Sequence, residues 1–351
     1  MKKVDYIVVG LGIAGVCFCK HLIDNNHSFI VITDALPGAT KQSGGVFNPI
    51  VLRRFTAPDD TPKFTEFAVD LYTKLEQLTQ RKFCIPEQEV FRVFASIEEQ
   101  NNWFTASDKR HLKSYITPKV EVNTNPSISA KFGLGRVSNS FKINPDIFLE
   151  SITSFLKSQE KIKIEPFEYS SLKSIGNESW QYKNIMTKNI VFSQGVKVLR
   201  NPFISAELIL PNKGEFLIIH SPALKLNSII KGGVYIIPLG SDNYKVGATY
   251  SPSDLSINAT VEAKEEIITK LENMITCEYQ IIDQVVGVRP VTKDRQPIIG
   301  KVNKGMYIFN GLGARGFTRG PLYSKILYDA IECSGSIPKK MDVSRFSVSS
   351  S

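Results

Sequence analysis

Short apolar runs alternate with glycine-rich turns and amphipathic stretches along the chain. The first run, Tyr6–Val9, is β-branched and uncharged, which is typical of a strand buried on both faces. It leads into Gly10-Leu-Gly12-Ile-Ala-Gly15, followed by a helical pattern over residues 14–25 and a second apolar run over residues 28–33. The pattern predicts a strand, a turn, a helix and a second parallel strand, which ends at Asp34.

Further elements follow this unit. Helices are predicted from Thr61, with Pro62 in the first turn, and over residues 146–158, 261–274 and the stretch after Pro321. Strands are predicted over residues 90–94, 161–165 and 190–192. Residues 206–250 are rich in strand patterns, and three runs, 215–220, 234–238 and 244–250, predict an antiparallel sheet with turns at 213–214 and 240–243. Residues 347–351 are predicted to form a disordered tail.

Composition narrows the class of protein. The 351 residues suit two domains, and the 42% of hydrophobic residues exclude a disordered chain. The longest uncharged run, Tyr6–Cys19, is shorter than the ~20 residues of a membrane span. The formal charge of +9 favours anionic partners, although the basic pairs are scattered. Five cysteines without a repeated spacing predict neither a disulfide framework nor a metal site.

The amino terminus has features of an export signal. Lys2 and Lys3 precede an apolar run that ends in small residues. Asp5 interrupts that pattern, and three glycines would weaken the helical region that a signal needs. A buried strand running into a turn explains the same residues, so we expect a cytoplasmic protein.

The glycine turn carries the clearest chemistry. Gly10 permits the tight turn, Gly12 lets the backbone approach a pyrophosphate, and Gly15 lets helix and strand pack closely. The start of the helix, Ile13 and Ala14, presents free N–H groups to an anion. Asp34, about twenty residues on, is placed to accept hydrogen bonds from a ribose, which favours FAD or NAD over NADP.

A second polar, glycine-rich loop spans residues 38–45. We expect its backbone N–H groups and side chains to line a pyrophosphate and an isoalloxazine ring, with an ordinary surface loop as the alternative. The candidate residues are Thr40, Gln42, Ser43, Gly44 and Gly45. This loop favours FAD, since nicotinamide enzymes usually continue with another strand and helix, but the residues alone leave a nicotinamide enzyme open.

Two later segments suggest a family. Gly287-Val-Arg289-Pro and the run from Met306 to Pro321, together with Gly10–Gly15, resemble the D-amino-acid-oxidase type of FAD-dependent oxidoreductases. Within that family they are most similar to glycine oxidase and to the oxidase half of the bifunctional tRNA 5-methylaminomethyl-2-thiouridine biosynthesis enzyme. The match covers nearly the whole chain and is weakest over residues 80–130.

The resemblance implies roles for individual residues. Arg289 would bind a substrate carboxylate, for which a planar guanidinium is suited. Tyr235 and Tyr250 would line the substrate pocket, although tyrosines in a strand more often serve packing. The implied cofactor-binding residues of the later segments are Gly195, Gly311, Gly313, Ala314, Arg315, Gly316, Phe317 and Thr318. No metal is implied.

The resemblance also implies an architecture, α/β plus α+β. A Rossmann-like FAD-binding domain would comprise residues 1–45, 130–200 and 285–351. A discontinuous antiparallel-sheet substrate domain would comprise 46–129 and 201–284.

Three functions are consistent with the sequence. The first is oxidation of the C–N bond of an amino acid or N-substituted glycine, with hydride transfer to flavin. The second is a tRNA wobble-uridine oxidase that removes a carboxymethyl group, which the positive charge favours. The third is a flavin- or NAD-binding dehydrogenase without amine oxidase activity. The partners expected are therefore a small amine or amino acid, and in the second case tRNA.

Overall fold

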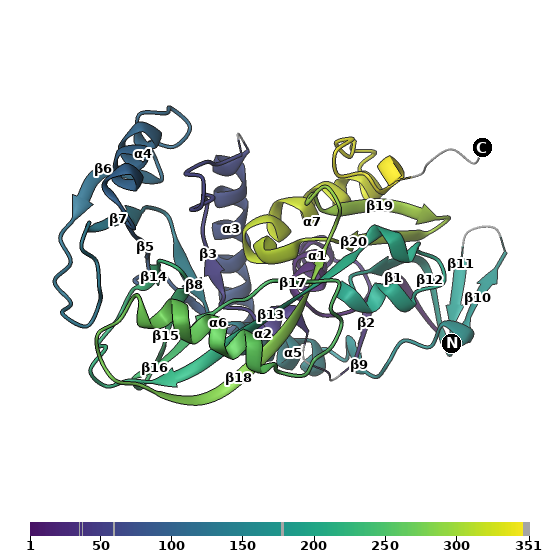
Figure 1. The fold of residues 1–351 in the computed structure, drawn as a ribbon. Helices are drawn as coiled ribbons and strands as arrows, with labels where there is room; N and C mark the ends of the chain where they lie inside the picture. The colour runs from purple at the N-terminus through teal and green to yellow at the C-terminus, as the bar shows by residue number, and fades with distance from the viewer. Residues whose placement is uncertain (35, 37, 59, 177–178, 347–351) are drawn as a thin grey trace.

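A computed structural model of the chain describes residues 1–34, 36, 38–58, 60–176 and 179–346. The residues expected to form a disordered tail, 347–351, lie outside the described residues. The described part contains two large sheets, one small sheet and seven α-helices (Figure 1). No helix within these ranges has both the length and the apolar composition needed to cross a bilayer.

One large sheet contains the predicted α/β unit. Its central strands β1, β2, β9, β12 and β20 pair in parallel, with β12 and β2 on either side of β1. Strands β10, β11 and β19 are attached in antiparallel pairs. The strands are β1 (Lys2–Val9), β2 (Phe29–Thr33), β9 (Ile162–Ile164), β10 (Leu172–Ile175), β11 (Ser179–Tyr182), β12 (Ile185–Phe192), β19 (Ile298–Asn303) and β20 (Met306–Asn310).

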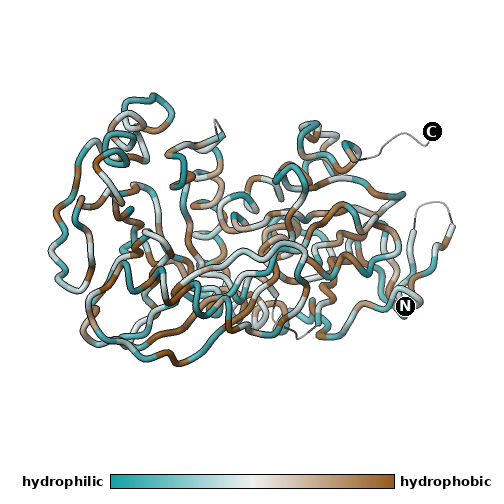
Figure 2. Tube along the Cα trace, in the orientation of Figure 1, coloured by the Kyte–Doolittle hydropathy of each residue, from teal (hydrophilic) through white to brown (hydrophobic). Residues whose placement is uncertain are grey.

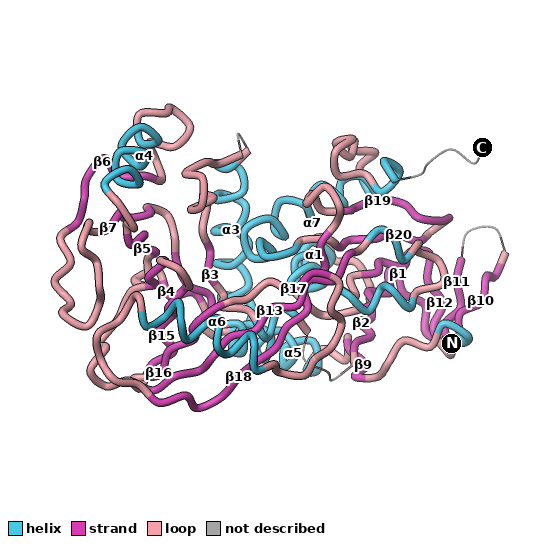
Figure 3. The backbone as a smooth tube through the Cα atoms, viewed as in Figure 1, coloured by secondary structure: helices cyan, strands magenta, loops and turns pink. Residues whose placement is uncertain are grey.

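The second large sheet is antiparallel except for one parallel pair, β14 with β5. Its long central strand β13 pairs with β16 and β17 on one side and with β18 on the other. The strands are β5 (Val90–Val93), β6 (Ile116–Glu121), β7 (Leu134–Val137), β13 (Leu210–His220), β14 (Ile229–Lys231), β15 (Tyr235–Gly240), β16 (Asn243–Gly247), β17 (Ser251–Pro252) and β18 (Gln280–Val291). Figure 3 shows α6 lying against the strands of this sheet.

A small sheet of β3 (Val46–Phe47), β8 (Phe141–Ile143) and β4 (Cys84–Ile85) follows the second glycine-rich loop. The helices are α1 (Ile13–Asp24), α2 (Ala39–Gln42), α3 (Thr61–Thr79), α4 (Ile97–Ser107), α5 (Pro145–Ser158), α6 (Val261–Glu272) and α7 (Gly316–Glu332). Short 3₁₀ turns are η1 (Tyr169–Ser171), η2 (Gly195–Arg200), η3 (Ala206–Leu208), η4 (Gly313–Arg315) and η5 (Val343–Phe346).

Local chemistry explains where helices begin. In α5 the Asn144 side chain accepts hydrogen bonds from the N–H groups of Asp146 and Ile147, at 3.1 and 3.2 Å, and Pro145 occupies the first turn. In α6 the Thr260 hydroxyl accepts from the Ala263 N–H at 3.3 Å. The helices predicted from Thr61, 146 and 261 are therefore confirmed within a few residues.

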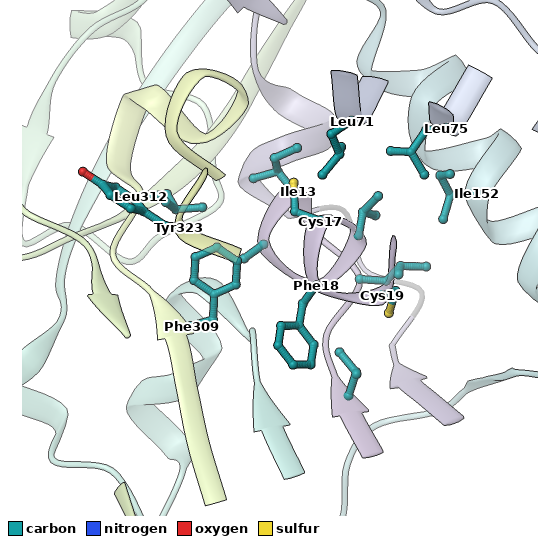
Figure 4. Packing of buried hydrophobic residues seen from close by; sticks show 14 of the residues in the cluster. Ile13, Cys17, Phe18, Cys19, Leu71, Leu75, Ile152, Phe309, Leu312 and Tyr323 are labelled. Atoms are coloured by element: carbon teal, nitrogen blue, oxygen red, sulfur yellow. The ribbon is translucent and has the colours of Figure 1, made fainter. Parts of the chain in front are cut away.

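Helix α1 is enclosed by the protein. Its side chains from Ile13 to Leu22 are buried except His21, and α7 and α3 pack beside it and each other (Figure 4). Cys17 and Cys19 lie in this core as small apolar groups. Figure 2 shows that apolar residues run through the interior strands. The burial fixes the N-terminus of α1, which carries the glycine turn, against the sheet.

The predicted turn at 213–214 is wrong. Strand β13 continues without interruption through Lys213, Gly214 and Glu215, which pair in register with Val288, Gly287 and Val286. Two charged residues around a glycine are typical of a turn, but here Lys213 and Glu215 are buried and pair with each other at 3.2 Å. The turn at 240–243 is confirmed as the hairpin between β15 and β16.

The domain boundaries drawn from the sequence stay predictions. Strand pairing shows that β7 and all of β18 belong to the antiparallel sheet. Residues 292–297 connect the end of β18 to β19 of the parallel sheet.

Candidate active site

The first glycine turn lies between β1 and α1 and contacts the end of β12. Gly10 has φ +97°, and a Cβ there would lie 2.5 Å from the Ser193 carbonyl oxygen. A Cβ at Gly15 would lie 2.1 Å from the Gly10 carbonyl oxygen. Only glycine fits at these two positions, because backbone occupies the space of a side chain.

The N-terminus of α1 faces the second loop. The first N–H groups of a helix have no acceptor within it, and α1 has no acidic residue in its first turn. The Thr40 hydroxyl accepts a hydrogen bond from the Ile13 N–H at 3.0 Å, and a Cβ at Gly12 would lie 3.2 Å from the same oxygen. Ala14 follows in the same turn. No side chain in this turn therefore carries a negative charge that would offset the partial positive charge of the helix N-terminus.

Asp34, directly after β2, forms an ion pair with Lys197. The Lys197 ammonium donates to both carboxylate oxygens, at 2.5 and 2.7 Å. Lys197 comes from η2, whose first residue, Gly195, follows β12. Asp34 and the segment after β12 therefore meet at one edge of the parallel sheet, across the end of β1, which lies between β2 and β12.

The second loop packs against strands of the antiparallel sheet and of the small sheet. Its first half is the short helix α2, where a loop was expected, and the Gln42 Cβ would lie 2.9 Å from a Cβ at Gly287 of β18. A Cβ at Gly44 would lie 2.4 Å from Ile237 of β15. Gly45 has φ +64°, and a Cβ there would meet the Ile143 carbonyl oxygen at 1.8 Å.

A buried lysine holds this loop. Lys245 of β16 donates to the Ser43 carbonyl at 3.0 Å and lies over the Phe216 ring. Burial lowers the pKa of Lys245 to about 8. The Ser43 hydroxyl in turn donates to the Thr40 carbonyl at 2.8 Å.

The last glycine turn joins β20 to α7. Gly311 and Gly313 have φ +73° and +55°, and Asn310, just before them, donates to the Gly195 carbonyl at 2.9 Å. A Cβ at Gly316 would lie 2.8 Å from Ile13 of α1, so this turn abuts the first glycine turn. Of the remaining predicted residues here, Ala314 is exposed, while Phe317 and Thr318 are buried in α7.

Arg289 lies on β18, beside Gly214 of β13, which has no side chain. Its guanidinium stacks on the Tyr250 ring, 4.5 Å from the ring centre, and fills the space where a Cβ of Gly214 would be. Its Nη1 makes only long contacts, 3.3 Å to the Thr249 carbonyl and 3.5 Å to both the Lys213 carbonyl and the Asn212 side-chain oxygen. Among the residues that the structure describes, no carboxylate forms an ion pair with Arg289.

Tyr235 and Tyr250 lie near a second guanidinium, that of Arg315. Arg315 donates to the Ile50 carbonyl at 2.8 Å, and the phenols of both tyrosines act on it electrostatically. Burial raises the pKa of Tyr235, whereas Tyr250 is 64% exposed. The three residues implied for substrate binding are thus brought into one neighbourhood with Arg315, at the junction of the two sheets.

Comparison with known families identifies the chain. The family model described as FAD dependent oxidoreductase, DAO, matches residues 5–330. The chain belongs to the DAO family. It is accordingly an FAD-dependent oxidoreductase, and its cofactor is FAD.

Two curated relatives illustrate the range of this family. Glycine oxidase of Bacillus subtilis strain 168 is 20% identical over 325 residues, which cover 86% of this chain and 85% of the relative. The tRNA 5-methylaminomethyl-2-thiouridine biosynthesis bifunctional protein MnmC of Idiomarina loihiensis is 23% identical over 217 residues, 56% of this chain. The match spans only 35% of the length of that bifunctional protein.

A solved structure has the same fold as this DAO-family chain. Glycine oxidase from Geobacillus kaustophilus superposes with a TM-score of 0.78 at 16% identity, over 100% of both chains. The predicted fold class, a Rossmann-like FAD-binding part with an antiparallel-sheet part, is confirmed.

The residues of the candidate site fit the FAD of the DAO family. The Ser193 hydroxyl, beside Gly10, is buried and has no hydrogen-bond partner among the described residues. The uncompensated N-terminus of α1 suits a pyrophosphate, and a Cβ at Gly195 would meet nothing within 4 Å. These features leave room and hydrogen-bonding capacity for a dinucleotide along the edge of the parallel sheet.

Sequence reasoning missed three cations of this region. Lys197 and Lys245 contact Asp34 and Ser43 from segments more than 160 residues away. Lys142 of β8 is buried, donates to the Pro238 carbonyl, and has a pKa that burial lowers to about 8. Nothing local to these lysines in the sequence distinguishes them from surface residues.

Proposed function

We propose that the protein oxidises the C–N bond of an N-substituted glycine or a related amino acid. The observation that carries the proposal is Arg289, a partly buried guanidinium without a carboxylate partner among the described residues, held beside Tyr250 at the junction of the two sheets. A substrate carboxylate would complete its hydrogen bonds in bidentate geometry.

The proposed cofactor residues divide into three groups. Gly10, Gly12, Ile13, Ala14 and Gly15 would hold the pyrophosphate, with Asp34 on the ribose. Thr40, Gln42, Ser43, Gly44 and Gly45 would line the flavin from the second loop. The remaining residues, Gly195, Gly311, Gly313, Ala314, Arg315, Gly316, Phe317 and Thr318, would bind it from the last turn and η2. FAD, when bound, supplies the two-electron acceptor.

The protein's own part in the reaction is orientation. With its carboxylate fixed by Arg289, and with Tyr235 and Tyr250 as pocket walls, the substrate has few orientations left, which is a proximity effect. The carbon next to nitrogen loses a hydride and the nitrogen loses a proton, giving an imine. Water then hydrolyses the imine to an amine and, from an N-substituted glycine, glyoxylate. This reaction needs no side chain as a nucleophile.

Anaerobic flavin reduction tests the proposal. The visible spectrum of the FAD-loaded protein should bleach on addition of glycine, sarcosine (N-methylglycine) or iminodiacetate. Arg289→Ala should retain FAD and lose at least about a hundredfold in kcat/KM with the best of these substrates, because one charged, bidentate contact is removed. Unchanged turnover in Arg289→Ala would contradict the carboxylate clamp.

A second candidate is oxidation of a modified wobble uridine in tRNA. It is supported by the similarity to the bifunctional MnmC protein and by the net charge of +9. Carboxymethylaminomethyl is itself an N-substituted glycine, so the same C–N oxidation applies. A flavin that stays oxidised with the small amines but bleaches with hypomodified tRNA would support this candidate. Its binding to tRNA should weaken steeply with salt.

The third candidate is a dehydrogenase without amine oxidase activity. Its flavin would stay oxidised with both the small amines and tRNA. The cytoplasmic location stays a prediction.

A further inference from the structure

Arg289 and Arg315 lie at Tyr235 and Tyr250 without an acidic partner, and Arg319 lies one helical turn after Arg315. Arg289 stacks on Tyr250, Arg315 is close to both tyrosines, and Arg319 acts electrostatically on Arg315. No carboxylate in the described part of the chain forms an ion pair with any of the three. By contrast, Arg92 pairs with Glu99, Arg136 with Glu89 and Arg345 with Asp294 at 2.6 to 2.8 Å, and Arg81 pairs with Glu150 at 3.7 Å.

The hydrogen-bonding capacity of these guanidiniums is largely unused. Each has five N–H donors. Arg315 makes one bond, to the Ile50 carbonyl, and Arg319 makes one long bond of 3.3 Å to the Arg295 carbonyl. The Nε atom of Arg319 is buried and has no acceptor among the described residues. A buried donor without an acceptor is costly, so these groups are suited to a ligand that brings oxygen atoms.

The position of Arg315 and Arg319 on α7 adds to the positive charge. Arg315 is the residue before the first turn and Arg319 follows one turn later, while the first turn contains no acidic residue. Helix N-termini carry a partial positive charge that favours anions, so two cations there are unfavourable unless an anion joins them. Burial, followed by the charge of Arg319, lowers the pKa of Arg315 to about 10.

The backbone of the turn before α7 and the side chain of Arg315 contact different parts of the protein. The backbone at Gly316 abuts Ile13 of the first glycine turn, where a Cβ would lie 2.8 Å away. The side chain of Arg315 reaches the Ile50 carbonyl and the two tyrosines. A cofactor contact by the backbone of this turn is therefore compatible with a substrate contact by the Arg315 side chain.

We infer that the substrate is an N-substituted glycine whose substituent carries a second carboxylate. Arg289 binds the glycine carboxylate, and Arg315 with Arg319 binds the second one. The inference rests on the proposed function and narrows its substrate class to amines that carry a second carboxylate. Paired guanidinium contacts with each carboxylate would neutralise the cluster.

Binding of two unreactive thioethers tests the second contact. Thiodiacetate and (methylthio)acetate differ by one carboxylate, and neither contains a C–N bond. Calorimetric titration of the FAD-loaded protein should give a Kd at least about tenfold lower for thiodiacetate, since a charge-assisted hydrogen bond contributes on that scale. Equal affinities would overturn the inference.

Matched variants locate the effect. Arg315→Gln and, independently, Arg319→Gln should bring the ratio of the two Kd values toward one, and the second variant covers the case in which the first fails to fold. Arg110→Gln removes the same charge from an exposed position and should keep the wild-type ratio. If Arg110→Gln lowered the ratio of the two Kd values by a similar amount, the preference for thiodiacetate would be a general effect of charge. That result would contradict a second carboxylate site at Arg315 and Arg319.

Two further outcomes separate this inference from the proposed function. If iminodiacetate and sarcosine reduce the flavin with equal kcat/KM, the dianion inference fails while amine oxidation stands. If thiodiacetate is preferred but neither amine reduces the flavin, amine oxidation fails while the second anion contact stands. Inorganic phosphate that competes as tightly as thiodiacetate would assign the contact to a phosphate group and overturn the dicarboxylate.

Discussion

The guanidinium of Arg289 occupies the side-chain space of Gly214. A Cβ at position 214 would lie 2.1 Å from Nη2 and 2.4 Å from Cζ of Arg289. The two residues lie on neighbouring strands, where Gly214 pairs with Gly287 and Asn212 pairs with Arg289. The absence of a side chain on β13 thus lets the guanidinium lie flat on the sheet and stack on Tyr250.

Gly214→Ala should therefore displace Arg289 without removing it. We expect kcat/KM for the best N-substituted glycine to fall about tenfold or more, mainly through KM, since the displaced guanidinium loses its alignment with the carboxylate. FAD content should stay at the wild-type level, because Gly214 lies outside the glycine turns. Steady-state kinetics and the flavin spectrum measure both.

A double-mutant cycle provides the control for this prediction. In an Arg289→Lys background the same Gly214→Ala change should cost little, because the fork of the guanidinium is already absent. Equal costs in both backgrounds would mean that Gly214 acts through the strand and not through Arg289.

Gly15→Ala should abolish FAD binding. The new methyl group would lie 2.1 Å from the Gly10 carbonyl oxygen, and the first glycine turn cannot move away because Gly10 itself abuts the Ser193 carbonyl. Gly233→Ala is the matched control, since Gly233 lies between β14 and β15, outside the glycine-rich turns and loop, and a Cβ there would make only ordinary contacts of 3.4 Å or more. Flavin retained per polypeptide after gel filtration measures the difference. A Gly15→Ala protein that keeps its flavin would contradict the close packing of this turn.

The parts of the fold that the sequence predicts are those with local signals. The strand–turn–helix–strand unit from Tyr6 to Asp34 combines turn chemistry with two different periods of apolar residues, and all its elements are observed. The caps of α5 and α6 are equally local. The turn predicted at Lys213-Gly214-Glu215 is wrong, because charged residues on both sides of a glycine are typical of turns. The burial of Lys213 and Glu215 depends instead on partners 41 to 69 residues away.

The candidate site shows the same division. Gly10 and Gly15 are recognisable from the sequence because their spacing after a predicted strand is typical of a dinucleotide-binding turn. The partner of Asp34, Lys197, comes from a distant segment, and the partial burial of Arg315 depends on how the two sheets meet. Contacts of this kind depend on tertiary packing, which no window of sequence contains.

Glu215→Gln should destabilise the antiparallel sheet. Glu215 is 1% exposed, accepts hydrogen bonds from the Thr260 hydroxyl at 2.9 Å and from Gln284 at 2.7 Å, and pairs with Lys213. Removing its charge leaves Asp254 as the remaining ion-pair partner of the buried Lys213 among the described residues, so we expect a loss of about 3 kcal/mol in the free energy of unfolding.

Urea unfolding of the FAD-loaded protein measures that loss. Glu266→Gln on the exposed face of α6 removes the same charge from a surface pair with Lys270 and should cost less than about 1 kcal/mol. Similar losses in the two variants would show that the buried network contributes no more than a surface pair.

His21 should make the protein sensitive to mild acid. Burial, followed by the charge of Lys325, lowers the pKa of His21 to about 4, and its Nε2 lies 3.0 Å from the Ser324 hydroxyl of α7. In the unfolded chain the pKa returns to about 6.5, so the unfolded state binds a proton first as the pH falls. The neutral His21 therefore costs the folded state nothing above pH 6.5, and the free energy of unfolding falls between about pH 6.5 and 4.

We expect the free energy of unfolding to fall by about 1–2 kcal/mol between pH 7 and pH 5. His21→Gln, which keeps a polar group beside Ser324, should remove most of that fall. Urea titrations of both proteins at the two pH values measure the difference, and an equal fall in His21→Gln would assign the acid sensitivity to other groups.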